Sequence, residues 1–168
     1  MNLYLMRHGI AVPRDAQEIH SDRERPLTQK GIKRMRKAAK GLSALAIPFD
    51  RILSSPLTRS RQTAELVAEV LNIKKRLEEI QELAPDKTVQ DLLSSLTPYR
   101  GEKHLLLVGH EPLLSEIASF LLSRGKDVEI YLKKGGLCCI EVDELPTKKA
   151  ALLHWMLTPK QLRLLSGS

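Results

Sequence analysis

The sequence has few cysteines, few aromatic residues and no long apolar run. Of its 168 residues only two are cysteines, and these are the neighbours Cys138 and Cys139. Adjacent side chains of a strand point to opposite faces of a sheet, so we do not expect a disulfide between them. No CxxC pair or zinc-ligand spacing occurs either. We therefore expect two reduced, buried thiols and no cysteine-based metal site.

No apolar stretch has the length of a transmembrane helix or the pattern of a signal peptide. The first apolar run begins at Leu3 and is interrupted by Arg7 and His8. A membrane-spanning helix needs roughly 20 predominantly apolar residues, and a signal peptide needs an uninterrupted apolar segment after a basic start. We therefore expect a cytoplasmic protein without a membrane partner.

Aromatic residues make up 4% of the chain, so aliphatic side chains must form the core. Their scarcity argues against a stacking platform for single-stranded nucleic acid. The formal net charge is +7, with basic residues densest at Lys33–Lys37. A solvated helix face is the simplest interpretation, and we expect no nucleic-acid partner, although a basic nucleic-acid-binding protein is the minority hypothesis. The sign of the charge suits an anionic partner.

The length fits one domain, residues 1–168, with a substantial core. Apolar periodicity and capping residues predict strands and helices in alternation. We expect strands at 3–6, 51–54, 77–80, 104–108, 136–142 and 151–157. We expect helices that begin with Thr28, Ser55 and Thr88 as N-caps and with Pro112, the first three ending near residues 45, 71 and 96. This order predicts a three-layer α/β/α sandwich with a mainly parallel central sheet, whose last two strands form an antiparallel edge.

Three strand-to-helix junctions carry polar residues that are unusual beside buried strands. Arg7-His8-Gly9 follows the first strand, the stretch Ser54–Arg59 follows the second, and Gly109-His110 follows the fourth. Ligands bind at the carboxyl ends of parallel strands, which meet at one edge of the sheet. Two arginines and two histidines beside helix N-termini suit a tetrahedral dianion, because guanidinium and backbone N–H groups bind phosphate oxygens.

The same stretches resemble the motifs of a known family. LMRHG at 5–9, SSPLTRSRQTA at 54–64 and VGHEP at 108–112 are similar, in order and spacing, to the motifs of the histidine phosphatase superfamily, which includes the cofactor-dependent phosphoglycerate mutases. The chain has little room for the insertions of the larger members, and its compact form resembles the SixA-type phosphohistidine phosphatases. The stretches 25–31, 82–85 and 157–159 also resemble that branch. The resemblance implies a phosphoglycerate mutase-like fold.

The resemblance further implies a phosphatase that uses no metal and no other cofactor. His8 would attack phosphorus in line through an unprotonated ring nitrogen and form a phosphohistidine that water hydrolyses, while its other ring nitrogen donates to a backbone carbonyl. Arg7 and Arg59 would clamp the phosphoryl oxygens, and His110 would donate to one of them. Gly9 would let the backbone turn closely beneath the ring, as part of the substrate-binding set.

Two further residues have weaker support. Arg25 ends a polar stretch, 13–25, that we expect to be a loop; the resemblance implies that this loop reaches over the phosphate, and an ordinary loop cation is the equal alternative. Glu82 is the candidate general acid, with Glu78 and Glu79 as rivals. A purely structural role is the alternative for Glu82.

The chemistry of the leaving group separates two substrate classes. A phosphate monoester leaves as an alkoxide and benefits strongly from a proton donor, whereas phosphohistidine leaves as an imidazole, which is easier to expel once protonated. We expect the chain to dephosphorylate phosphohistidine in a protein, such as a histidine-containing phosphotransfer domain. The alternatives are a phosphatase for small phosphomonoesters and a phosphate-binding regulatory module without turnover. The sequence leaves the partner protein and the oligomeric state open.

Overall fold

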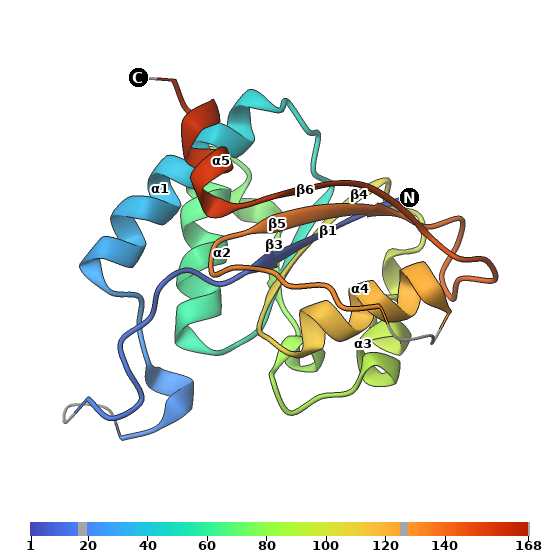
Figure 1. Ribbon diagram of the computed structural model, residues 1–168, viewed down its shortest axis with the longest axis horizontal. Helices are drawn as coiled ribbons and strands as arrows, with labels where there is room; N and C mark the ends of the chain where they lie inside the picture. The colour runs from blue at the N-terminus through green and yellow to red at the C-terminus, as the bar shows by residue number, and fades with distance from the viewer. Residues whose placement is uncertain (17–19, 125–127, 168) are drawn as a thin grey trace.

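The computed structural model describes residues 1–16, 20–124 and 128–167 as a central sheet between two layers of helices (Figure 1). Six strands pair in the order β3-β2-β4-β1-β5-β6. Their bounds are β1 Asn2–Arg7, β2 Arg51–Ser54, β3 Leu77–Glu79, β4 His104–Gly109, β5 Leu137–Glu141 and β6 Leu152–Leu157. The first four are mutually parallel, and β5 and β6 are antiparallel to their neighbours. The predicted fold class, with its antiparallel edge, is confirmed.

Helices cover both faces of the sheet (Figure 1). Helices α1, α2 and α5 pack on one face and α3 and α4 on the other. The helix bounds are α1 Gln29–Ala44, α2 Thr58–Val70, α3 Val89–Ser95, α4 Leu113–Ser123 and α5 Pro159–Leu165. Short 3₁₀ turns complete the description: η1 Asp22–Glu24, η2 Lys74–Arg76, η3 Gln81–Leu83 and η4 Thr97–Tyr99.

The sheet separates the core into two clusters, and strand β1 contributes alternate side chains to both. Leu3 and Leu5 belong to the cluster beneath α3 and α4, whereas Tyr4 and Met6 belong to the cluster beneath α1, α2 and α5. All four side chains are buried. A strand that is covered on both faces reads as a continuous apolar run, which is the pattern of residues 3–6.

The register of the parallel strands brings their carboxyl ends to one level. Arg7 of β1 pairs with Gly109 of β4, and Ser54 of β2 pairs with Val108 of β4. The ladder continues one step further, because the backbone N–H of His8 donates to Gly109 O and that of Ser55 donates to Val108 O. The residues that follow these strands therefore meet at a single edge of the sheet.

The capping predictions are confirmed at two helices and wrong at a third. The hydroxyls of Thr28 and Thr88 accept N–H bonds from the first turns of α1 and α3. Ser55 is not the N-cap of α2. That helix begins at Thr58, because the backbone of Ser55 still belongs to the sheet ladder and the first carbonyl to accept helical bonds is that of Leu57.

Helix α5 was not among the predicted elements. Its seven residues begin after Thr158, whose hydroxyl and backbone form a capping box with Gln161. The helix packs Leu162 into the cluster beneath α1 and α2. A seven-residue helix shows too few turns for a periodic apolar pattern, and only the capping box marks it in the sequence.

The predictions of two buried thiols and of a solvated basic helix face are confirmed. Cys138 and Cys139 are both free and buried. The run 33–37 lies on α1 with its basic side chains exposed and Met35 buried. Within the described ranges, no helix has the length and apolar character that would span a membrane.

Replacement of Gly41 by alanine tests the packing of α5 on α1. A Cβ atom at Gly41 would lie 1.7 Å from the carbonyl oxygen of Leu162, so the two helices must move apart. Overpacking of this kind outweighs the gain in helix propensity, and we expect Gly41→Ala to lower the free energy of unfolding by about 1–3 kcal/mol. Urea unfolding measures the change. Gly101→Ala is the control, because a Cβ there meets nothing within 4 Å; equal stability of the two variants would contradict this packing.

Candidate active site

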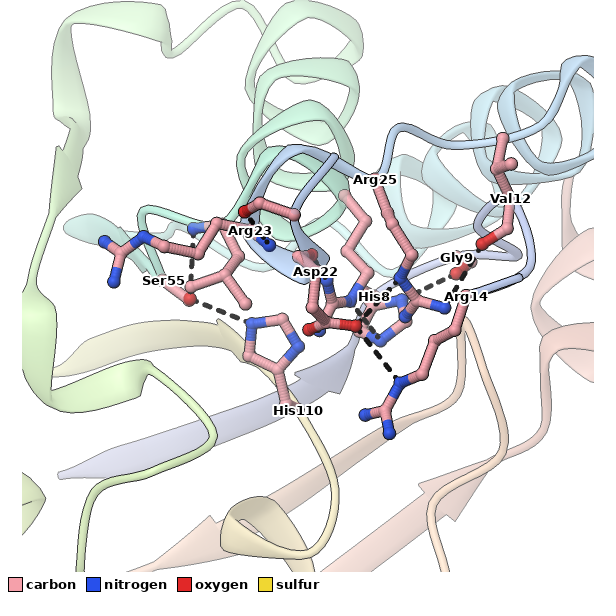
Figure 2. A network of polar contacts seen from close by, with 12 residues as sticks. His8, Gly9, Val12, Arg14, Asp22, Arg23, Arg25, Ser55 and His110 are labelled. Atoms are coloured by element: carbon pink, nitrogen blue, oxygen red, sulfur yellow. Dashed lines mark hydrogen bonds and ion pairs between the residues drawn. The ribbon is translucent and has the colours of Figure 1, made fainter. Parts of the chain in front are cut away.

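The three polar junctions of the sequence meet at the carboxyl edge of β1, β2 and β4 (Figure 2). His8 follows β1, His110 follows β4, and Arg59 lies in the first turn of α2. All three side chains are buried. The ring centroids of His8 and His110 are 5.0 Å apart. The structure thus brings together residues from three distant parts of the chain.

The ring of His8 is held in one orientation and one tautomer. Its Nδ1 lies 2.7 Å from Gly9 O, and a carbonyl oxygen only accepts, so Nδ1 carries the hydrogen. The other nitrogen, Nε2, accepts an N–H bond from Arg59 Nε at 3.3 Å. Nε2 therefore carries a lone pair and no hydrogen, which is the state of a nucleophile.

Both histidines of the site are neutral at pH 7. Burial, together with the charges of Arg59 and Arg7, lowers the pKa of His8 to about 3. Burial and the neighbouring His8 and Arg59 lower the pKa of His110 to about 2. An imidazole without water around it and with cations beside it disfavours a further positive charge.

Gly9 has a role that differs from the expected one. Its backbone φ is not positive, so the turn does not require glycine. A Cβ at this position would instead lie 2.6 Å from Met35 Cγ of α1. Gly9 N–H also donates to Thr63 Oγ1 in α2 at 3.0 Å. The missing side chain therefore lets α1 approach the end of β1, and the participation of Gly9 in substrate binding stays a prediction.

Arg7 is anchored from a segment far along the chain. Its Nη1 donates to Leu132 O at 2.8 Å, and its backbone carbonyl accepts from the N–H of Gly135. The guanidinium carbon lies 6.0 Å from the centre of the Tyr131 ring. Arg7 Nε is buried and has no hydrogen-bond partner within the described residues. A buried donor without an acceptor is costly, and an anion in the site would supply the acceptor.

Asp22 connects the arginines of the site and was missed by sequence reasoning. Arg59 donates from Nη1 to the backbone carbonyl of Asp22 at 2.7 Å and from Nη2 to its Oδ2 at 3.0 Å. The other carboxylate oxygen forms ion pairs with Arg25 Nε at 3.0 Å and Arg14 Nε at 3.1 Å (Figure 2). The sequence gives no local signal for it, because the stretch 13–25 holds four acidic residues and nothing distinguishes Asp22 from the other three.

The carboxylate of Asp22 is ionised in this setting. Partial burial opposes its charge, but Arg59, Arg25 and Arg14 outweigh burial and hold its pKa below the usual value. Arg25 itself is largely buried and also donates to Val12 O at 3.2 Å. The loop that carries both residues therefore lies against Arg59, and the contact of Arg25 with phosphate stays a prediction.

The ring of His110 has one partner and one unpartnered nitrogen. Its Nε2 lies 2.8 Å from Ser55 Oγ. Its Nδ1 is buried and, in the part of the chain that the structure describes, has no hydrogen-bond partner. Arg7 Nε and His110 Nδ1 are thus two buried polar atoms of the site without a hydrogen-bond partner among the described residues. A polar ligand could supply the missing bonds.

The candidate acids are placed less favourably. Glu82 lies in η3 and, within the described residues, makes no hydrogen bond or ion pair with a site residue. Glu78 pairs with Arg51 at 2.7 Å and with the Tyr99 hydroxyl at 2.8 Å, so it is held by structural partners. Glu111 directly follows His110, and burial raises the pKa of its carboxyl. Among the described residues, no group of three or more His, Cys, Asp or Glu side chains forms a metal site.

Comparisons with known proteins place this arrangement in context. The family model of the histidine phosphatase superfamily (branch 1) matches residues 3–87. An uncharacterised protein of Picosynechococcus sp. is 37% identical over 139 residues, 82% of each chain. The phosphohistidine phosphatase SixA of Escherichia coli is 29% identical over 167 residues, 98% of each chain. A solved structure of the protein histidine phosphatase SixA complexed with tungstate superposes with a TM-score of 0.83 at 27% identity and covers 96% of this chain and 99% of that chain.

A pH titration tests the electrostatics of the histidine pair. The pKa is lowered to about 3 for His8 and to about 2 for His110. Both rings therefore stay neutral as pH falls from 8 to 5, whereas a free histidine gains its proton near pH 6.5. We expect the ring ¹⁵N shifts of His8 and His110 to remain constant over this range. A histidine-containing peptide serves as the reference, and a midpoint near pH 6.5 for either ring would contradict the described burial.

Replacement of Asp22 by asparagine tests whether its carboxylate competes with an anion for the arginines. The change removes a negative charge from Arg59 and Arg25 without removing much volume. We expect Asp22→Asn to lower the inhibition constant of tungstate, a tetrahedral oxyanion, by about 3- to 10-fold, the size of one screened charge interaction. Glu24→Gln is the control, since Glu24 is an exposed acid of the same turn. An unchanged or higher constant for Asp22→Asn would assign Asp22 a purely positioning role.

Proposed function

Because this chain belongs to the histidine phosphatase superfamily, we propose that it hydrolyses phosphohistidine in a protein by attack of His8 on phosphorus. The observation that carries the proposal is the state of His8. Its ring is neutral and its Nδ1–H donates to Gly9 O. Its Nε2 has a lone pair, which accepts an N–H bond from Arg59. Such a nitrogen needs no base to activate it.

The first step transfers the phosphoryl group to His8. The lone pair of His8 Nε2 forms a bond to phosphorus while the P–N bond to the substrate imidazole breaks in line, and the departing imidazole takes up a proton from solvent water. The N–H of Arg59 that Nε2 accepted in the free site turns to a phosphoryl oxygen. Arg7 and Arg25 add positive charge at the oxygens, where charge is stabilised in the transition state.

The second step restores the enzyme. A water molecule attacks the phosphorus of phospho-His8 from the side that the substrate imidazole has left. The P–Nε2 bond breaks, inorganic phosphate leaves, and His8 returns to its neutral tautomer with Nδ1 still bonded to Gly9 O. The same arginines stabilise the charge in both steps.

A protein substrate is favoured by the surroundings of the site. Two relatives that match nearly the whole chain are named as a phosphohistidine phosphatase and a protein histidine phosphatase. A groove of about 570 Å³ runs beside the site between α3, α4 and residues 128–131, and its wall includes Tyr131, which neighbours Arg7. Such a groove gives room for the surface that surrounds a phosphorylated histidine.

A phosphatase for small phosphomonoesters is the second candidate and depends on a proton donor. Glu82 is the proposed donor in that case, and Glu111 is a second carboxyl, whose pKa burial raises. Glu82 makes no bond to a site residue within the described residues, and phosphohistidine depends less on such a donor because its imidazole is easier to expel than an alkoxide. A regulatory module without turnover has no need of a nucleophile, and the complete set of His8, Arg7, Arg59 and His110 speaks against it.

The test compares substrates and removes the nucleophile. Purified protein in a chelating buffer is given a histidine-phosphorylated phosphotransfer domain and a panel of phosphomonoesters. We expect faster turnover of the phosphohistidine and a loss of about 10³-fold or more in His8→Ala, since loss of a nucleophile abolishes the covalent route. His154→Ala is the control, because His154 is exposed and pairs with Glu141 on β5. Preference for a monoester would overturn the substrate, and turnover without His8 would overturn the mechanism.

A further inference from the structure

Ser55 makes two contacts that tie the second junction to the third. Its side chain is fully buried at the end of β2. The hydroxyl oxygen accepts the backbone N–H of Leu57 at 3.3 Å and lies 2.8 Å from His110 Nε2 (Figure 2). The serine predicted to cap a helix therefore faces the site histidine instead.

The direction of the bond to His110 follows from the donors and acceptors present. The N–H of Leu57 only donates, so the Ser55 oxygen is the acceptor of that bond. The hydroxyl hydrogen then needs an acceptor, and within the described residues the only remaining neighbour in hydrogen-bond range is His110 Nε2. If Nε2 carried a hydrogen instead, both the hydroxyl hydrogen and the Nδ1 lone pair would be buried without a partner, whereas the Nδ1–H form leaves only the Nδ1–H unpaired and therefore costs less free energy.

The tautomer of His110 follows in turn. A neutral imidazole carries one ring hydrogen, and the low pKa of His110 keeps the ring neutral. With Nε2 as the acceptor from Ser55, the hydrogen is on Nδ1. Nδ1 is the buried ring nitrogen without a partner, and Figure 2 shows it on the side of the ring that faces Asp22 and His8.

We propose that Ser55 is a positioning residue that fixes His110 in the Nδ1–H tautomer, so that Nδ1 donates to an oxygen of the phosphoryl group held in front of His8. In the opposite tautomer Nδ1 would present a lone pair to an anionic oxygen and repel it. This role rests on the proposed phosphatase function, but the tautomer itself is a property of the free protein. Ser55 does not touch the substrate and acts only through His110.

The arrangement parallels that of the nucleophile. Gly9 O accepts from His8 Nδ1 and leaves Nε2 as a lone pair, whereas Ser55 donates to His110 Nε2 and leaves Nδ1 as an N–H. The two neutral rings, with centroids 5.0 Å apart, thus present ring nitrogens of opposite character to one phosphoryl group. His8 presents a lone pair, and His110 presents an N–H donor.

The test measures the tautomer directly. Two-bond ¹H–¹⁵N spectra of the ¹⁵N-labelled protein distinguish a protonated ring nitrogen from a bare one, and His110→Ala assigns the signals. We expect a protonated Nδ1 and a bare Nε2 at His110 in the wild type, a shift toward the Nε2–H form in Ser55→Ala, and the wild-type pattern in Ser55→Thr, which keeps the hydroxyl. Ser54→Ala is the matched control, because Ser54 is the neighbouring buried serine and bonds to Ser55 O and Ser60 Oγ but not to His110.

Kinetics provide the second measurement. We expect kcat/KM for a phosphohistidine protein to fall about 10- to 100-fold in Ser55→Ala, less than the 10²- to 10³-fold typical when an oxyanion donor is deleted, and the tungstate inhibition constant to rise in parallel. In a His110→Ala background the same change should add less than about 2-fold, because the two residues act as one unit. Thermal unfolding of each variant separates these effects from loss of structure.

The tautomer and the kinetics can each overturn the proposal independently. An Nε2–H tautomer in the wild type, or an unchanged tautomer in Ser55→Ala, overturns the proposal whatever the kinetics. A changed tautomer with unchanged kcat/KM and tungstate inhibition also overturns it. If the protein turns over no phosphohistidine, the proposed function fails, and the tautomer together with direct binding of tungstate decides the role of Ser55. Should Ser55→Ala not fold, the wild-type spectrum and Ser55→Thr decide it.

Discussion

The parallel pairing of β1 and β2 with β4 is the constraint on which the site depends. It places the carboxyl ends of three strands at one level, so that the residues one step beyond them, His8, Ser55 and His110, become neighbours although 102 positions separate the first from the last. Apolar packing on both faces of β1 and β4 makes a slip of one residue costly, because it would move every buried side chain to the opposite cluster. The packing that fixes the register of the strands therefore also fixes the relative positions of the residues at this edge.

Burial of so many polar groups is tolerated because most are paired within the protein. Arg59, almost wholly buried, pairs with Asp22 and with the His8 ring, and both histidines avoid the cost of a buried charge by remaining neutral. Within the described residues, the buried atoms of the site without a hydrogen-bond partner include Nε of Arg7 and Nδ1 of His110. The free energy that folding loses at those two atoms is available to an anionic ligand, since only an acceptor restores it.

Much of the fold could be read from the sequence, and the limits have physical causes. Strand and helix positions followed from apolar periodicity, and the meeting of His8, Arg59 and His110 followed from strand order. Asp22 was not predictable, because no local pattern reveals that a loop acid will reach arginines from α2 and from its own loop. The partner of Ser55 was missed for a related reason: a Ser-Pro pair resembles a helix start locally, whereas its bond to His110 spans 55 positions.

The anchoring of Arg7 has a consequence for how the protein matures on the ribosome. Arg7 emerges early, but the carbonyl that holds its guanidinium belongs to Leu132, and the N–H that binds its backbone belongs to Gly135. His8, which follows Arg7 directly, is thus synthesised long before the segment that completes its surroundings. Contacts of such high sequence separation form late in folding, because they require closure of a long loop. A nascent chain that stops short of β5 has every residue of the three motifs and still lacks a finished site.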